Sequence, residues 1–180
     1  MSARPLVEVS IEVPAAPDEL GALHKALGRF WAEIDRALPA PPEQEWRLHF
    51  ATALGEAGAN VVRHAYRGGS TQGSMRVELI AFPDRVEARL IDRGVELVGG
   101  LPPIAAAPEA DELAEHGYGL ALIRAAVDEL RYERVLGSPQ DENRWLLVKR
   151  LPTPSAPPQR RSRRAAPRWQ RRGRGRRPAA

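Results

Sequence analysis

Glu56-Ala-Gly-Ala-Asn60, followed by His64-Ala-Tyr66, is the most informative segment of this chain of 180 residues. Residues four apart stack on one face of a helix, so Glu56, Asn60 and His64 predict a polar stripe on an otherwise apolar helix. A carboxylate beside a carboxamide offers a proton acceptor next to an oxygen ligand for a hard cation such as Mg²⁺. Helices often carry a Glu and an Asn four apart by chance, so the stripe needs support from elsewhere in the chain.

Two short downstream segments supply that support. Asp92-Arg-Gly94 directly follows a predicted strand, and Gly117-Tyr-Gly119-Leu120 opens a predicted helix. Two glycines at a helix N-terminus expose amide donors to a phosphate, where the helix dipole favours negative charge. An Asp-x-Gly after a strand is by itself only a turn signal, and a glycine pair can simply form a tight turn. It is therefore the whole set of segments, in this order along the chain, that indicates a site for a phosphate and a cation.

The set resembles the ATP-binding fold shared by gyrase, Hsp90, histidine kinases and the mismatch-repair protein MutL, over residues 6–151. Within that group the chain is most similar to the small serine/threonine kinases that act as bacterial anti-sigma factors, since we find no phosphoacceptor-histidine helix pair or sensor segment. The resemblance implies a protein kinase that requires ATP and Mg²⁺. It also implies two protein partners, a sigma factor and an anti-sigma factor antagonist that is phosphorylated on serine, and a homodimer.

The resemblance assigns roles to the residues of the polar stripe. Glu56 matches the family's catalytic glutamate, which accepts the proton of an attacking hydroxyl. Asn60 matches the metal ligand, whose side-chain oxygen coordinates Mg²⁺ at the phosphates. His64 and Tyr66 complete the helix signature Asn-x-x-x-His-x-Tyr, and we expect structural roles for both.

The downstream segments correspond to the nucleotide contacts of the family. Asp92 is the expected adenine contact, because an ionised carboxylate only accepts hydrogen bonds and so selects the amine of adenine over the carbonyl of guanine. Gly94 lets the backbone approach the base. Gly117, Gly119 and Leu120 lie where the family binds the triphosphate, after a long loop at 92–116 that is expected to form an ATP lid. The chain departs from the usual Asp-x-Gly-x-Gly motif, because Glu96 stands at the second glycine.

Hydrophobic periodicity predicts one α+β domain. Alternation of apolar and polar residues predicts strands at 6–13, 75–82, 86–91, 131–136 and 144–151. Helical spacing predicts helices at 17–38, 43–66 and 117–130. Adjacent hairpin strands favour a mixed, largely antiparallel sheet with the helices on one face, a two-layer sandwich. The apolar row of the first helix is typical of a core face, and its Trp31 is also a candidate for a dimer or partner surface.

Composition divides the chain into two unlike parts. Ten arginines and no acid lie between Arg160 and Arg177, and without them 17 basic residues stand against 23 acidic ones, a net charge of about −6. We therefore predict a globular domain at 1–151 and a disordered tail at 152–180, which has too few apolar residues to fold. The tail is either a solubilising segment or a contact for an acidic partner or nucleic acid. Its Arg-Gly repeats with one aromatic residue suit RNA better than sequence-specific DNA reading.

Several classes of protein and site are excluded or disfavoured by the sequence. The chain has no cysteine, so disulfides, thiolate metal sites and thiol nucleophiles are excluded. No apolar run approaches the roughly 18 residues that a membrane span needs, and the first residues lack an apolar signal core. We therefore expect a cytoplasmic protein with no membrane association. Two other interpretations stay open: a non-catalytic switch that binds ATP, and a nucleic-acid-associated protein that acts through its tail.

Overall fold

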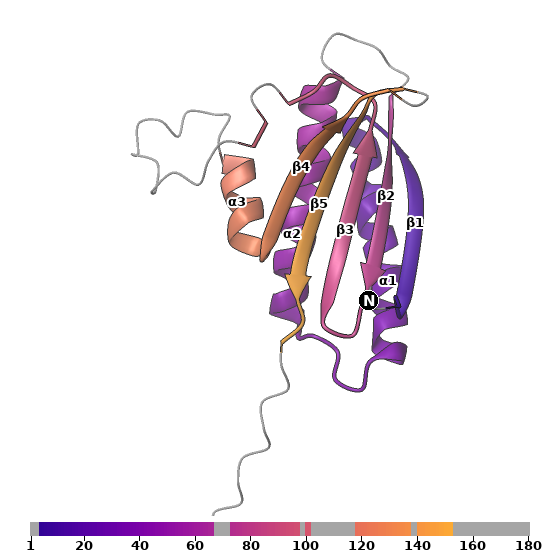
Figure 1. The fold of residues 1–180 in the computed structure, drawn as a ribbon. Coiled ribbons are helices and arrows are strands. Elements are labelled where there is room, and N and C mark those ends of the chain that lie inside the picture. The colour runs from indigo at the N-terminus through magenta and orange to yellow at the C-terminus, as the bar shows by residue number, and fades with distance from the viewer. Residues whose placement is uncertain (1–3, 67–72, 98–99, 102–117, 138–139, 153–180) are drawn as a thin grey trace, which may run out of the picture.

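The computed structural model describes residues 4–66, 73–97, 100–101, 118–137 and 140–152 (Figure 1). The elements in chain order are β1 (Val7–Pro14), η1 (Pro17–Leu20), α1 (Gly21–Ala37), α2 (Gln44–Asn60), η2 (Val61–Ala65), β2 (Ser74–Ala81), β3 (Arg85–Asp92), α3 (Tyr118–Ala126), β4 (Glu129–Val135) and β5 (Glu142–Arg150). The described strands form one sheet in the order β1-β2-β3-β5-β4. Every pairing in that sheet is antiparallel.

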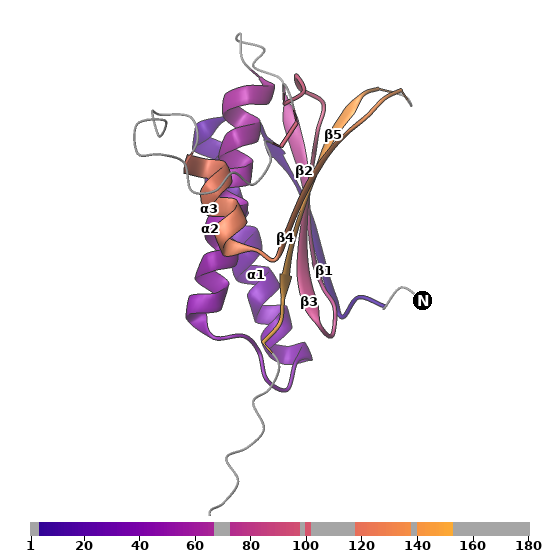
Figure 2. The same cartoon turned by 60° about the vertical axis from the view of Figure 1, so that its left-hand side comes forward.

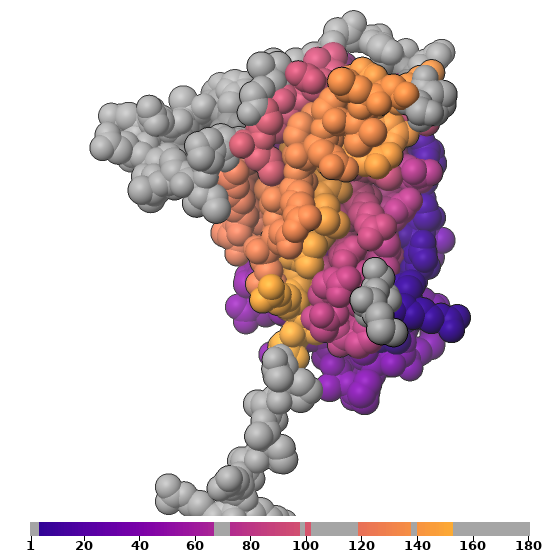
Figure 3. Space-filling model, in the orientation of Figure 1, coloured from indigo at the N-terminus to yellow at the C-terminus, as the bar shows by residue number. Residues whose placement is uncertain are grey.

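The molecule has two layers, as the sequence predicts. Figure 2 shows α1, α2 and α3 together on one face of the sheet, while the other face is free of helices in the part of the chain that is described. The space-filling view looks onto that second face (Figure 3). The α+β two-layer sandwich is therefore confirmed. A hairpin turn at Pro83-Asp84 joins β2 to β3, and the Phe82 N–H donates there to the Arg85 carbonyl at 2.8 Å.

The hydrophobic core lies between the helices and the sheet. The apolar faces of the first two helices are buried there: Leu23, Leu27, Phe30 and Ile34 from α1, with Phe50, Leu54 and Ala57 from α2 and Val61 after it. Trp31 is half-buried and packs edge-on to Trp46 and Phe50, with ring centroids 6.2 and 5.9 Å apart. The core-face interpretation of the first helix is confirmed.

The sheet register decides which residues face the helices. Side chains alternate between the two faces of a strand, and Asp92 has the same parity as the buried Leu90 and Ala88 of β3. Asp92 pairs with Asn143 across β3 and β5, and Asn143 pairs with Arg134 across β5 and β4. Three polar residues thus stand side by side on the helix-facing side of the sheet, at the end of β3.

The third helix is shorter than the predicted span of 117–130. It ends at Ala126 because the chain then pairs with β5: the Asp128 N–H donates to the Val148 carbonyl at 2.8 Å, and the Asp128 carboxylate accepts the Arg150 N–H at 2.6 Å. Leu130, which continued the helical spacing, is a strand residue opposite Leu147. The helix predicted at 43–66 is confirmed in extent, since α2 and η2 run without a break from Gln44 to Ala65, but its last part at Val61–Ala65 is a π-helical turn.

No helix in the described ranges combines the length and the apolar character needed to cross a bilayer. The predicted tail at 152–180 lies outside the described residues except for Pro152, so the division into domain and tail stays a prediction.

Candidate functional site

Glu56 and Asn60 lie where α2 meets the first turn of α3. A Cβ atom added to Gly119 would be 3.0 Å from Glu56 Oε2 and 3.4 Å from Asn60 Oδ1. The two polar side chains therefore lie against the backbone of α3 at a position where any larger residue would press on them. Residues predicted from two separate segments are brought together here: the carboxylate and carboxamide of α2 and the glycine of a helix N-terminus.

The two side chains of α2 differ in their access to solvent. The Glu56 side chain is 31% exposed, and its Oε2 lies 3.6 Å from Arg63 Nη2. Asn60 is 8% exposed, so its amide is presented from inside the fold. Leu120 is half-buried and follows Gly119 in α3, whereas Gly117 lies outside the described residues.

Asp92 carries the most informative buried group of the site. It is 2% exposed, and its Oδ1 accepts the Gly94 N–H at 2.9 Å and the Asn143 amide N–H at 2.8 Å. Its Oδ2 is buried without a hydrogen-bond partner in the described part of the chain. Burial raises the pKa of Asp92, against the lowering effects of Asn143, the Gly94 N–H and Arg134. An unsatisfied buried carboxylate oxygen is costly, so Oδ2 indicates a position for a ligand or a water.

The turn after Asp92 is pressed against the end of η2. A Cβ atom on Gly94 would be 2.3 Å from the Ala65 carbonyl oxygen, and the next N–H, of Val95, donates to that same oxygen at 2.7 Å. Only glycine permits this close approach of two backbones. The π-helical turn and the Asp92 turn therefore hold each other in place.

Tyr66 ties the same region to β2. Its hydroxyl donates to the Ser74 carbonyl at 2.9 Å and lies 3.3 Å from the Arg93 N–H, and burial raises its pKa. These contacts favour the structural role expected for Tyr66. His64 lines the cavity described next rather than continuing a straight stripe with Glu56 and Asn60, since the π-helical turn intervenes.

A small cavity connects Asp92 with the end of α2. Its volume is about 20 Å³, which holds one water molecule. The residues that line it come from α2 and η2, the Asp92 turn and the last two strands: Asn60, Val61, His64, Ala65, Asp92, Val95, Leu97, Tyr132, Asn143 and Trp145. Two of the predicted residues, Asn60 and Asp92, thus share one cavity although 32 positions separate them in the sequence.

Tyr132, Arg134 and Asn143 were missed by the sequence analysis. All three lie close to Asp92 through hydrogen bonds or charge. One signal was present in the sequence: Asn143 has the parity of the apolar Trp145 and Leu147, so it is a polar residue on the inward face of a strand. Its partner across the sheet depends on the register, which local periodicity does not reveal.

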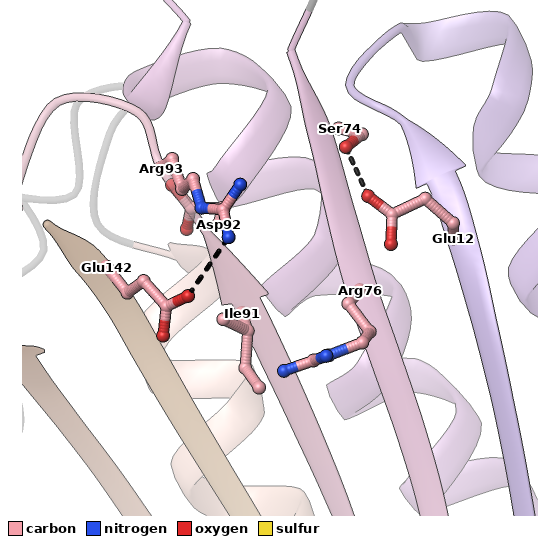
Figure 4. Close-up of a pocket in the computed structure, with 7 residues that line it drawn as sticks. All are labelled: Glu12, Ser74, Arg76, Ile91, Asp92, Arg93 and Glu142. Atoms are coloured by element: carbon pink, nitrogen blue, oxygen red, sulfur yellow. Dashed lines mark hydrogen bonds and ion pairs between the residues drawn. The ribbon is translucent and has the colours of Figure 1, made fainter. Parts of the chain in front are cut away.

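A second cavity, of about 150 Å³, lies on the opposite face of the sheet (Figure 4). Its charged side chains contact one another or their neighbours: Arg93 lies 3.4 Å from Glu142, Glu12 accepts a hydrogen bond from Ser74, and Arg76 lies 3.4 Å from Glu78. Asp92 also lines this cavity, but its side chain points to the other face of the sheet. Among the other described residues of the lining, no buried side-chain group lacks a hydrogen-bond partner. We therefore place the candidate site on the helix-facing side.

The oxygen ligands of the site are too few to enclose a metal ion, and they suit an ion that is bound mainly by waters and substrate phosphates. Among the described residues, no group of three or more His, Cys, Asp and Glu side chains could enclose a metal. Mg²⁺ does not need such a cage, because one or two protein oxygens with waters and substrate phosphates complete its coordination. The amide oxygen of Asn60, beside the N-terminal turn of α3, fits that requirement.

Comparison with known proteins identifies the family. Residues 13–145 match the model described as histidine kinase-like ATPase domain. Curated relatives carry the name serine-protein kinase RsbW. The protein from Bacillus pumilus (strain SAFR-032) is 27% identical over 138 residues, covering 69% of this chain and 77% of the relative. The protein from Bacillus subtilis (strain 168) is 25% identical over 134 residues, covering 72% and 79%.

Solved structures include the histidine kinase domain of the Erythrobacter litoralis EL346 blue-light activated histidine kinase. It has a TM-score of 0.40 and 15% identity, and the match covers 69% of this chain and 60% of that one. The Acinetobacter baumannii histidine kinase AdeS has a TM-score of 0.38 and 12% identity, with 81% and 68% covered. The family assignment rests on the match over residues 13–145, which confirms the resemblance seen in the sequence. This chain belongs to the family of histidine kinase-like ATPase domains.

Proposed function

We propose that this chain is a protein serine kinase of the anti-sigma type that uses ATP and Mg²⁺. One observation carries the proposal: the backbone of Gly119 lies against both Glu56 and Asn60, so a base, a metal ligand and a helix N-terminus meet at one point. The relatives named serine-protein kinase RsbW support transfer of phosphate to serine. Retention of Glu56 favours a kinase over a non-catalytic switch.

The adenine base occupies the side of the site formed by Asp92. The unpartnered Oδ2 accepts a hydrogen bond from the exocyclic amine, while Oδ1 stays bound to Gly94 and Asn143. The cavity of about 20 Å³ is too small for a purine. Most of the base would therefore lie outside this cavity, beyond the side chains of Val95 and Leu97, which line it.

The phosphates occupy the first turn of α3. The amide groups of Gly119 and Leu120 would donate to them, and the helix dipole favours their negative charge. The sequence assigns Gly117 to the same role, but that residue lies outside the described part of the chain. Asn60 would hold Mg²⁺ through its side-chain oxygen, and the bound ion would neutralise charge on the phosphate oxygens.

Glu56 acts on the protein substrate. Its carboxylate accepts the proton of a serine hydroxyl as the serine oxygen bonds to the γ-phosphorus. The bond from that phosphorus to the bridging oxygen breaks, and ADP leaves. Arg63, which contacts Oε2 of Glu56 at 3.6 Å, limits the orientations of the carboxylate.

The anti-sigma resemblance supplies the partners. In one state the protein binds a sigma factor, and in the other it phosphorylates an antagonist protein, as a homodimer in the cytoplasm. The ten arginines of the predicted tail favour a second, separate activity, the binding of nucleic acid or another polyanion.

The test is phosphate transfer from ATP to a purified antagonist protein. Glu56→Gln should keep ATP bound but slow transfer by about 10²–10⁴-fold, the usual contribution of a positioned base. Glu45→Gln is the matched control, because Glu45 is an exposed glutamate in the first turn of the same helix. Transfer at the parent rate by Glu56→Gln would show that Glu56 is not the base and would favour the non-catalytic switch.

A further inference from the structure

Asn143 is locked in one orientation beside Asp92. It is 1% exposed, and its Nδ2 donates to Asp92 Oδ1 at 2.8 Å. Its Oδ1 accepts from the Tyr132 hydroxyl and from Arg134 Nη1, each at 2.8 Å. A flipped amide would turn its NH₂ group toward the guanidinium donor, which cannot accept a hydrogen bond. The NH₂ group therefore has to face Asp92.

The same side chains hold the backbone that follows Asp92. Arg134 Nη1 donates to the Gly94 carbonyl at 2.9 Å, and the Tyr132 hydroxyl accepts the Leu97 N–H at 2.8 Å. Asn143 Nδ2 also lies 3.3 Å from the Gly94 carbonyl oxygen. Both the carboxylate and its loop are thus fixed from the last two strands of the sheet.

These contacts decide which carboxylate oxygen remains available. Oδ1 of Asp92 already accepts two hydrogen bonds, while Oδ2 has no partner within the described residues. If the carboxylate were free to rotate, either oxygen could turn away from a ligand. With Asn143 and the Gly94 N–H both directed at Oδ1, Oδ2 is the oxygen left to accept a hydrogen bond from a ligand.

We propose that Tyr132, Arg134 and Asn143 form a positioning cluster that orients the Asp92 carboxylate and thereby sets the selectivity of the site for adenine over guanine. This inference rests on the proposed function, in which Asp92 binds the base of ATP. The cluster acts through Asp92 and the loop at 94–97, and it leaves the phosphate and metal positions at Gly119 and Asn60 to other residues.

The electrostatics of the site agree with this role. Asn143, the Gly94 N–H and Arg134 lower the pKa of Asp92, although burial raises it more. Among the described residues, the titratable or charged groups that face Asp92 on the helix side of the sheet are His64 and Tyr66 from the end of the α2 region, with Tyr132 and Arg134 from β4. Arg93 and Glu142 lie near it on the other side. Loss of Asn143 or Arg134 removes part of what keeps the carboxylate ionised, so ATP binding should fail at a higher pH than in the parent.

The test compares ATP and GTP binding by calorimetry with Mg²⁺ on the full chain. Asn143→Leu and Tyr132→Phe should each lower ATP affinity about 3- to 10-fold, the usual effect of lost hydrogen bonds, and lower the ATP-to-GTP ratio accordingly. Arg134→Leu should lower the same ratio, whereas Arg131→Leu should not. Arg131 is the matched control, because it lies on the outer face of the same strand with its side chain 71% exposed.

A second measurement separates positioning from general damage to the fold. In an Asp92→Asn background, Asn143→Leu should cause a clearly smaller loss of ATP affinity than in the parent, since its effect through the carboxylate is already absent and only its contacts with the loop remain. The acid limit of ATP binding should move to higher pH in Asn143→Leu alone. Thermal unfolding identifies any variant that does not fold, and in that case Tyr132→Phe, which removes one hydroxyl group, carries the test.

Two failures have different meanings. A parent protein that binds no ATP refutes the nucleotide site and the cluster with it. A parent that binds ATP, with folded Asn143→Leu and Tyr132→Phe variants that keep its ATP-to-GTP ratio, refutes the cluster alone.

Discussion

Asp92→Asn should replace the hydrogen-bond acceptor that faces the base with a donor, and so reduce the preference for adenine as well as the affinity for ATP. Two donors, the Gly94 N–H and the Asn143 amide, point at Oδ1 of Asp92. An asparagine at this position must turn its carbonyl oxygen toward them, so its NH₂ group takes the place of Oδ2. The amine of adenine would then meet a donor where the parent offers an acceptor.

The size of the effect follows from the groups involved. The variant loses a buried hydrogen bond to a charged acceptor, which contributes about 1.5–3 kcal/mol in the parent, and this predicts about a 10- to 150-fold loss of ATP affinity. GTP carries a carbonyl at the corresponding position, so its affinity should fall much less. Calorimetry with both nucleotides in the presence of Mg²⁺ measures the ratio directly.

The folding stability of the Asp92→Asn variant provides a control, because it should stay the same or rise while ATP affinity falls. Because burial raises the pKa of Asp92, the folded state binds a proton at this carboxylate more tightly than the unfolded state does. The ionised group therefore destabilises the fold above its folded pKa, and the loss is relieved as pH falls through that value. Asp92→Asn removes this pH dependence, so near pH 7 the nucleotide-free variant should be at least as stable as the parent. Unchanged ATP selectivity, or a large loss of stability at neutral pH, would refute this account of Asp92.

Three further predictions concern the remaining parts of the chain. Asn60→Ala should weaken ATP binding in the presence of Mg²⁺ but change it little in EDTA, as titrations with and without the metal would reveal. Gly119→Ala puts a Cβ atom 3.0 Å from Glu56 Oε2 and should slow phosphate transfer about 10- to 100-fold in a folded protein; a parent-like rate would contradict the contact. Ending the chain after Leu151 should leave ATP affinity unchanged and abolish RNA binding, which in the full chain should weaken by orders of magnitude between roughly 50 and 200 mM salt. Fluorescence anisotropy with labelled RNA tests this last point, and equal binding by both proteins would place the basic surface in the folded domain.

The sequence predicted what depends on local periodicity. Glu56 and Asn60 were found because helical spacing alone puts them on one face, and Gly119 because a glycine pair opens a helix. Their meeting at one point is now seen in the structure, while their roles in catalysis and binding stay proposals.

What the sequence did not predict depends on partners far away in the chain. The end of α3 at Ala126 is set by pairing with β5, against the helical spacing that runs on to Leu130. Asn143 and Arg134 become neighbours of Asp92 only through the register of three strands. A shift of one residue would have turned each to the opposite face, and no local pattern specifies that choice.

The strand order has a consequence for the growing polypeptide during translation. β3 takes β5 as its neighbour, although α3 and β4 lie between them in the sequence. Asn143 is 51 positions beyond Asp92, so at 5–20 residues per second it is synthesised about 3–10 s later. For that time β3 has an open edge, which other chains can pair with. A nascent protein that stalls before β5 already contains the residues of α2, which carries Glu56 and Asn60. Its Asp92, however, has no Asn143 to orient it. We therefore expect nucleotide selectivity to arise only when the last strand joins the sheet.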